Sequence, residues 1–207
     1  TAALQDLGLK VLLVDFDPQA NASSGLGVDK RKIKHSVYDV VINEVPANQA
    51  IVHTNFGDVL PSHADLAGAG VELLSLPDPN HRLGQALKEI RDEYDLIFVD
   101  CPPSLELLTL NGLSAADSIL VPVQCEYLAL EGLSKLLNTI KIVKSGLNPH
   151  LEIEGFLLTL YSRNRLNNQV VAEVREHFGR LAFDTIIQRN IRLGEAPSHG
   201  KPEMLYD

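Results

Sequence analysis

Six short apolar runs, each ended by a polar or turn residue, recur along the chain. They lie at 10–15, 58–62, 95–100, 118–123, 153–160 and 184–188. Runs of this length between turn residues are typical of strands that are buried on both faces, as in a parallel sheet. The pattern therefore predicts a strand at each of these places.

Apolar residues at helical spacing lie between several of these runs. The stripes are Leu83, Ala86, Leu87 and Ile90; Leu133, Leu136, Leu137 and Ile140; and Val171, Val174 and Phe178. Each stripe can cover one face of a sheet. Because strands that alternate with helices are joined by right-handed crossovers, the predicted fold class is α/β, a doubly wound, mostly parallel sheet with helices on both faces.

Residues 16–56 interrupt this alternation with two glycines, a KRKIK run at 30–34 and a weakly periodic segment around Val37 and Val41. We expect a loop with one or two short helices there. The basic run is most simply a solvated surface, and a charge-binding role is the alternative. Since no repeat and no Pro/Gly/Ser-rich linker divides the chain, residues 1–207 are predicted to form one domain.

The composition fits an ordinary folded domain, with 207 residues, 45% hydrophobic and 22% charged. No apolar run approaches the roughly 18 to 20 residues of a membrane span, and the first ten residues do not resemble a secretion signal. The sequence therefore predicts a cytoplasmic protein without a membrane segment. Cys101 and Cys125 stand alone, which disfavours a disulfide framework or a structural zinc site.

The net charge of −9 argues against a generally basic nucleic-acid binder. The charge is unevenly distributed, because six of the nine arginines lie between positions 161 and 192. The net charge of that stretch is +3, and the net charge of the rest of the chain is −12. A local basic face on an acidic protein is therefore compatible with the sequence.

Three aspartates end predicted strands: Asp15 and Asp17 in VLLVDFDPQ, and Asp100 in DLIFVDCPP. Residues two apart on a strand face the same side, so Asp15 and Asp17 can point into one cleft. A run of hydrophobic residues followed by aspartate is the pattern by which nucleotide hydrolases hold Mg²⁺, through water and together with phosphate oxygens. The alternative is that each carboxylate caps the following helix.

Five separated blocks resemble the ParA/Soj family of chromosome- and plasmid-partitioning ATPases. They are VLLVDFDPQANASSGLG, LPSHADLAGAGVEL, YDLIFVDCPPSL, PVQCEYLALEGL and RNIRLGEAPSHGKP. Because they follow the family's order and span nearly the whole chain, the resemblance is far more specific than a lone DxD motif. It implies a P-loop fold in which ATP and Mg²⁺ join two subunits into a homodimer that binds double-stranded DNA without sequence preference.

The resemblance also implies that hydrolysis, stimulated by a ParB/Spo0J-type protein, releases the DNA, and that the protein is nucleoid-associated. Carried over by position, Asp17 orients the attacking water and Asp15 supports the metal and phosphate site. Asp100 is then the metal-binding carboxylate of the Walker B strand. All three are proton acceptors at pH 7, which suits water orientation and metal support.

The family's DNA-contacting positions fall on Arg163 and Arg192, and Arg165 and Arg189 could share that work. Exposed arginines on loops are otherwise simply solvated. In the family, the segment before RNIRL lines the adenine pocket, which makes Asn190 a polar contact to the cofactor. Gln188 stands where the family usually has proline, so the family's pocket shape is not carried over to this chain.

The family's glycine-rich phosphate loop does not occur in the 207 residues. The segment TAALQDLGLK resembles the last turns of the helix that follows this loop, and EMLYD stops short of a closing helix. We therefore expect a fragment, incomplete at both ends, that neither binds ATP tightly nor hydrolyses it. Without the family's first strand, strands 95–100 and 118–123 are expected to be separated or re-paired.

Two other function classes remain as alternatives. A non-catalytic ParA-like adaptor would keep the fold and surface without nucleotide chemistry, although the three retained aspartates count against it. A receiver-like signalling domain would use Asp15 and Asp17 to bind Mg²⁺ and accept a phosphoryl group. It would also need a lysine at a late strand end, and no lysine lies between positions 145 and 200.

Overall fold

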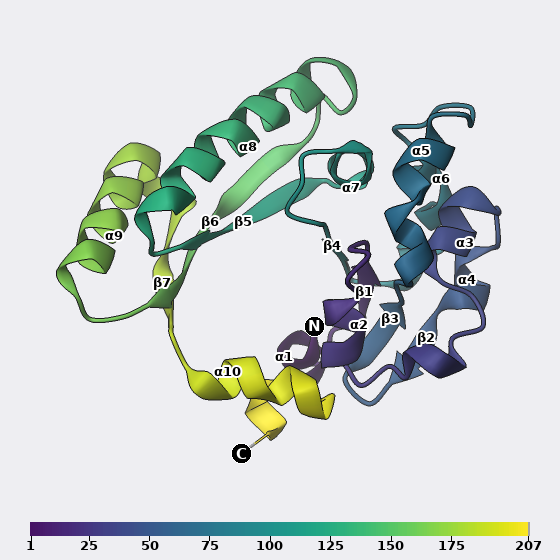
Figure 1. The fold of residues 1–207 in the computed structure, drawn as a ribbon, viewed down its shortest axis with the longest axis horizontal. Coiled ribbons are helices and arrows are strands. Elements are labelled where there is room, and N and C mark those ends of the chain that lie inside the picture. The colour runs from purple at the N-terminus through teal and green to yellow at the C-terminus, as the bar shows by residue number, and fades with distance from the viewer. Residues whose placement is uncertain (207) are drawn as a thin grey trace. The chain divides into compact units, whose positions relative to one another are not determined.

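The chain folds into two compact units, each with its own sheet. The computed structural model describes residues 1–206, with only the backbone for Tyr127 and Leu128. The first unit comprises Thr1–Ala115 and Arg192–Asp207, and the second comprises Ala116–Ile191 (Figure 1). The organisation as one domain over 1–207 stays a prediction.

The sheet of the first unit has the strand order β2-β3-β1-β4. Strands β1 (Val11–Asp15), β3 (Gly57–Leu60) and β4 (Leu96–Asp100) are parallel and confirm three of the predicted runs. Strand β2 (Val52–Thr54) pairs antiparallel with β3 and was not predicted. With one apolar residue in three, β2 is too short to give a strand signal.

The helices of the first unit are mostly short. They are α1 (Ala2–Asp6), α2 (Asn21–Gly25), α3 (Val37–Ile42), α4 (Ala47–Ala50), α5 (Ala69–Leu73), α6 (Arg82–Leu87) and α7 (Leu107–Ala115), with α10 (Ile191–Glu195) near the C-terminus. Helix α6 confirms the first apolar stripe, and α1 lies within the N-terminal segment that was expected to be helical. Helix α7 was missed because it is apolar on nearly all sides, which leaves no stripe to recognise.

Apolar clusters lie on both faces of β1. Leu12, Val14 and Phe16 are fully buried in one cluster with residues of α3, α5 and α6. Leu13 points the other way and packs with Leu26, which follows α2. The alternation along β1 therefore confirms a parallel sheet covered on both faces, as the doubly wound fold class predicts.

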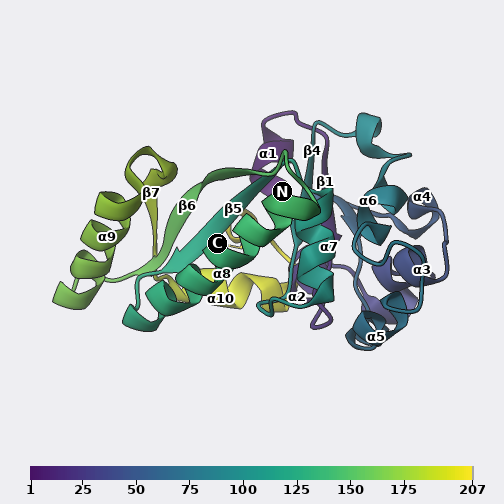
Figure 2. The ribbon, with the colours of Figure 1, turned by 90° about the horizontal axis from the view of Figure 1, so that it is seen from above.

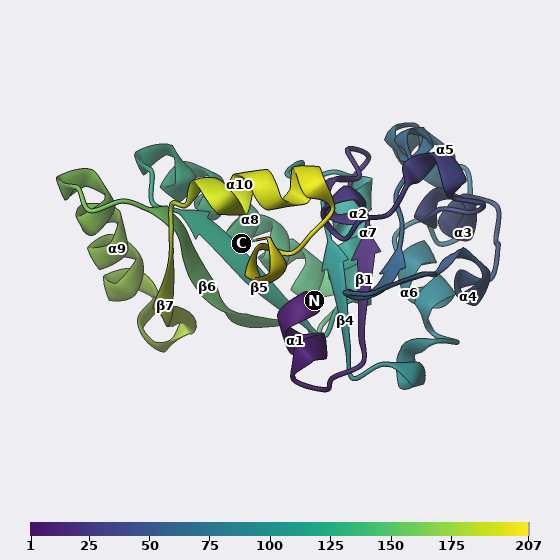
Figure 3. The same ribbon diagram turned by 90° about the horizontal axis from the view of Figure 1, so that it is seen from below.

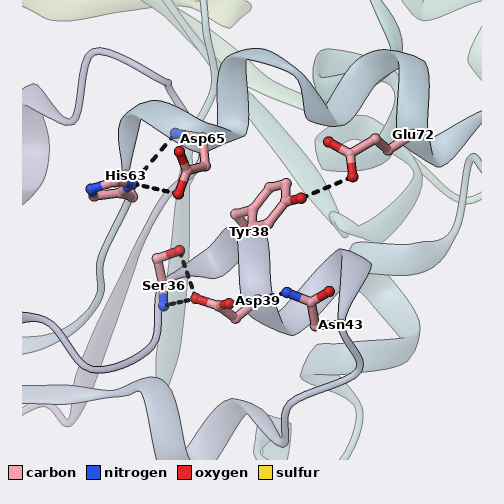
Figure 4. A network of polar contacts seen from close by, with 7 residues as sticks. All are labelled: Ser36, Tyr38, Asp39, Asn43, His63, Asp65 and Glu72. Atoms are coloured by element: carbon pink, nitrogen blue, oxygen red, sulfur yellow. Dashed lines mark hydrogen bonds and ion pairs between the residues drawn. The ribbon is translucent and has the colours of Figure 1, made fainter.

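Polar contacts fix helix α3 within the otherwise irregular region 16–56 (Figure 4). Ser36 and Asp39 form a capping box, in which the Ser36 backbone N–H donates to the Asp39 carboxylate over 2.8 Å. Asn43 donates to the same carboxylate over 3.1 Å. The Tyr38 hydroxyl donates to Glu72 of α5 over 2.8 Å, which joins two segments far apart in the sequence.

The second unit is a three-stranded parallel sheet with the order β5-β6-β7. Its strands β5 (Ser118–Gln124), β6 (Glu152–Tyr161) and β7 (Ala182–Gln188) confirm the remaining predicted runs. Helices α8 (Tyr127–Gly146) and α9 (Arg165–Phe178) confirm the other two stripes and pack in one apolar cluster with all three strands (Figure 2). No helix in the described part of the chain is long and apolar enough to cross a membrane.

Strands β4 and β5 are edge strands of two separate sheets. Leu96 of β4 is 40% exposed and Leu120 of β5 is 42% exposed. The residues of both strands are nevertheless apolar enough for the centre of a sheet. Among residues 1–206, no strand pairs with the outer side of either one. Within the described residues, β4 and β5 thus do not pair with each other.

Candidate functional site

Asp15 and Asp100 lie opposite each other at the carboxyl ends of neighbouring parallel strands. They are Cα partners in the register of β1 and β4. The backbone N–H of Phe16 donates to the Asp100 carbonyl oxygen over 2.8 Å, so the pairing continues one residue beyond Asp15. In open α/β sheets this edge is where ligands bind.

The Asp15 side chain is fully buried and anchored by Ser23. Its Oδ2 accepts hydrogen bonds from both the backbone N–H and the hydroxyl of Ser23, each over 2.6 Å. The Ser23 Oγ in turn accepts the backbone N–H of Ser62 over 3.2 Å. Burial raises the pKa of Asp15, while the hydrogen bonds from Ser23 oppose that rise. In this position Asp15 holds the start of α2 against the end of β1.

Asp17 lies two residues beyond Asp15 and is half-buried. Its Oδ1 accepts the backbone N–H of Gln19 over 2.9 Å, and its carbonyl oxygen accepts the N–H of Ala20 over 2.9 Å. Aspartates form turns of this kind readily. Asp17 therefore sits on a turn that is fixed by its own side chain and backbone.

Asp100 is the exposed member of the three aspartates. Incomplete hydration at the strand end, and then the negative charges of Asp15 and Asp17, raise the pKa of Asp100 to about 6. The three carboxylates are thus close enough to repel one another. Such a concentration of negative charge favours a bound cation.

The donor set fits a magnesium ion that is held largely by other ligands. In the part of the chain that the structure describes, no three His, Cys, Asp or Glu side chains are arranged to hold a metal ion. Mg²⁺ usually keeps several waters and is bound through one or two carboxylates together with phosphate oxygens. Asp100, as an exposed carboxylate, suits that kind of site, whereas Ser23 already occupies one oxygen of Asp15.

Ser23 is a site residue that the sequence reasoning missed. The available signal was a hydroxyl residue soon after the aspartate pair, in the first turn of a short helix. That signal is weak, because Ser24 stands next to it and uses its hydroxyl differently, donating to the Ala20 carbonyl oxygen over 3.0 Å. Only the fold shows which serine reaches Asp15.

The four candidate DNA-binding arginines are divided between the two units. Arg163, on the loop between β6 and α9, Arg165, the first residue of α9, and Arg189, directly after β7, belong to the second unit. Arg192 lies in α10 and belongs to the first unit. All four are exposed, and a DNA-binding face that includes Arg192 stays a prediction.

A buried asparagine fixes the loop that carries Arg163. The Asn167 side chain is 6% exposed and donates to the Cys125 carbonyl oxygen over 2.5 Å. Its Oδ1 accepts the backbone N–H of Ser162 over 2.6 Å. Asn164 caps α9 by accepting the Asn167 N–H over 2.8 Å. The ends of β5 and β6 are thus tied together next to Arg163.

Asn190 is exposed and lies beyond the end of β7, whose last residue is Gln188. Its contact with an adenine ring stays a prediction.

The C-terminal segment packs closely on α2, within the first unit (Figure 3). Gly27 and Gly200 cross backbone to backbone, and both have positive φ, +79° and +61°. A Cβ built on Gly200 would lie 2.8 Å from the Gly27 Cα, so no side chain fits there. Ala196, in the same C-terminal block, is buried. The crossing holds the EAPSHGKP block against the helix that anchors Asp15.

Comparisons with known proteins show the family of the chain. A protein-family model described as an AAA domain matches residues 1–153. The sporulation initiation inhibitor protein Soj of Bacillus subtilis is 49% identical, over 100% of this chain and 80% of its own. The chromosome partitioning protein ParA of Myxococcus xanthus is 50% identical, over 100% of this chain and 74% of its own. The chain belongs to the ParA/Soj family.

A solved structure shows the same fold. Cobyrinic acid a,c-diamide synthase from Mycobacterium smegmatis, with bound ADP and magnesium, matches 99% of this ParA/Soj chain and 81% of its own, with a TM-score of 0.86 and 38% identity. The likeness confirms the α/β fold class.

Proposed function

We propose that this ParA/Soj chain forms the core of an ATPase that partitions DNA, acting through a MgATP-bound homodimer. The observation that carries the proposal is the placement of Asp15 opposite Asp100, with Asp17 on a fixed turn just beyond. Two carboxylates at adjacent strand ends create the negative site that a phosphate-bound Mg²⁺ requires. The family relationship supplies the class of substrate.

Each aspartate has a distinct part in the proposal. Asp17 accepts a hydrogen bond from the attacking water and so orients it. Asp100 holds Mg²⁺, directly or through its waters, and bound Mg²⁺ neutralises charge on the phosphates. Asp15 supports the metal and phosphate site from its buried position, where it also fixes the end of β1 and the start of α2.

The DNA-binding part of the proposal rests on the arginines. Arg163, Arg165, Arg189 and Arg192 contact backbone phosphates, which gives affinity without sequence preference. A ParB/Spo0J-type partner stimulates hydrolysis and thereby releases the DNA. The proposed location is the cytoplasm, in association with the nucleoid.

The 207 residues contain no glycine-rich phosphate loop. We therefore propose that they bind MgATP weakly by themselves, because few backbone N–H groups and no loop lysine are available for the phosphates. Isothermal titration calorimetry of the 207-residue chain with MgATP tests this point. Micromolar affinity would show that the proposal of weak binding is wrong.

A matched pair of variants tests DNA binding. Fluorescence anisotropy with a labelled duplex should show weaker binding for Arg163→Ala than for the unaltered chain. The slope of log K against log salt should fall by about 0.9, the value for one lost phosphate contact. Arg180→Ala removes an exposed arginine that has no proposed DNA role and serves as the control. Equal losses in both variants would contradict a specific role for Arg163.

The second candidate is a non-catalytic adaptor with the ParA fold. Reading the DNA upstream of the codon for Thr1 separates the two candidates. An in-frame segment of the KGGxGKT type would favour the ATPase, and a start codon directly before Thr1 would favour the adaptor.

A further inference from the structure

A hollow of about 490 Å³ lies where the three strands of the second unit end. Its lining residues are Glu126, Leu160, Ser162, Asn164, Leu166, Asn167 and Arg189. Ser162 and Asn164 flank Arg163, so the hollow adjoins the loop with the strongest candidate DNA contact. The hollow therefore brings an acidic and a basic side chain to the edge of the proposed DNA-binding region.

The backbone of Arg189 is fixed, while its side chain reaches across to a carboxylate. The Arg189 N–H donates to the Tyr161 carbonyl oxygen over 2.9 Å, which extends the pairing of β6 with β7. The guanidinium Nη2 donates to Glu126 Oε1 over 3.1 Å. The two side chains are 57% and 54% exposed. Exposed ion pairs of this kind contribute little to stability, so another anion can displace the carboxylate at small cost.

Glu126 occupies the N-cap position of α8 but does not cap it. Within the described residues, its side chain makes no hydrogen bond to a backbone N–H of the helix. Side-chain oxygens at this position usually accept such a bond. The Glu126 carboxylate instead accepts a hydrogen bond from the Arg189 guanidinium, the same group that would bind a DNA phosphate.

We propose that Glu126 is an intramolecular competitor of DNA for Arg189. The inference rests on the proposed DNA-binding function and adds an element that limits affinity. To bind Arg189, a backbone phosphate must replace the Glu126 carboxylate, which also repels the phosphate at close range. Arg189 therefore contributes less to DNA affinity than its charge alone would provide.

A double-mutant cycle on the full 207-residue chain tests the inference. The proteins are the unaltered chain, Glu126→Gln, Arg189→Gln and the double variant, with binding to a labelled duplex measured by anisotropy from about 50 mM salt upwards. Glu131→Gln is the matched control, because Glu131 lies on α8 in a similarly exposed ion pair with Lys135, at 3.0 Å against 3.1 Å for Glu126 and Arg189. Thermal unfolding of each protein reports on folding.

We expect Glu126→Gln to tighten DNA binding by about two- to five-fold and to steepen the salt slope by up to about 0.9. When Arg189 is already replaced by Gln, Glu126→Gln should change DNA affinity no more than the control Glu131→Gln does. Equal effects of Glu126→Gln and Glu131→Gln would overturn the inference. If Arg163→Ala weakens binding while Glu126→Gln does not tighten it, only the competitor role fails. These measurements are made with MgATP in large excess, since the proposed DNA-binding form is the MgATP-bound dimer. Absence of DNA binding at every salt concentration under these conditions would overturn the proposed function as well.

Discussion

Asp15 and Asp100 are direct neighbours across β1 and β4, yet the first side chain is fully buried and the second is exposed. The difference arises because Ser23 of α2 covers Asp15, whereas Asp100 lies on an edge strand. Two similar strand ends therefore have different chemistry. The buried carboxylate suits structural anchoring, and the exposed one suits contact with a cation.

Replacing Asp100 should change how stability depends on pH. The pKa of Asp100 is raised to about 6 in the folded protein, while an unfolded aspartate titrates near about 3.9. Between these values the folded state binds more protons, so Asp100 lowers stability as pH rises from about 4 to 6. Asp100→Asn should therefore increase the free energy of unfolding at pH 7 by about 1 kcal/mol, a value reduced for solvent screening.

Urea denaturation at pH 7 and near pH 4 measures this effect. The gain should fall to a small fraction at the lower pH, where Asp100 is protonated in the folded state and about half protonated in the unfolded state. Asp92→Asn, which removes an exposed carboxylate at another place, is the control. A gain of the same size at both pH values would contradict the explanation.

Removing the Ser23 hydroxyl should destabilise the first unit. Ser23→Ala takes one hydrogen bond from the buried Asp15 carboxylate and leaves the Ser62 N–H without its acceptor. We expect a loss of about 2 to 4 kcal/mol in urea denaturation at pH 7. Ser24→Ala should cost about 1 kcal/mol or less, since Ser24 contacts only a backbone carbonyl. Similar losses for the two serines would argue against a special role for Ser23.

The crossing of Gly27 and Gly200 predicts a strong effect of a single methyl group. Gly200→Ala places a Cβ 2.8 Å from the Gly27 Cα on a residue with positive φ, so the C-terminal segment must shift. The expected loss is about 1 to 3 kcal/mol. Gly194→Ala, where the Cβ meets nothing within 4 Å, should be neutral or slightly stabilising. Thermal unfolding of the two variants, measured side by side, decides whether the crossing is tight.

Asn167 should be needed to order the Arg163 loop. Asn167→Ala removes the buried links to Cys125 and Ser162, and we expect a loss of about 2 to 3 kcal/mol. The Ser162 amide should also exchange its hydrogen faster, because its acceptor is gone. Asn168→Ala removes only an exposed contact with the Tyr161 hydroxyl and is the control. Unchanged exchange at Ser162 in Asn167→Ala would contradict this role.

Pattern and composition predicted most of the regular structure. Each of the six predicted strands is present, because buried parallel strands leave continuous apolar runs that local sequence reveals. The sequence pattern did not predict strand β2 or helix α7. Strand β2 is too short, and helix α7 is buried on nearly all sides. Both depend on contacts with distant residues and therefore leave little periodic signal.

The sequence by itself determined the family, the strand ends that carry Asp15, Asp17 and Asp100, and the concentration of arginines late in the chain. Tertiary structure alone decided that Ser23 anchors Asp15, that Gly200 crosses Gly27, and that Glu126 faces Arg189. The reason is physical. Apolar periodicity is local and survives in the order of residues, whereas burial, hydrogen-bond partners and pKa values depend on which distant segments the fold brings together.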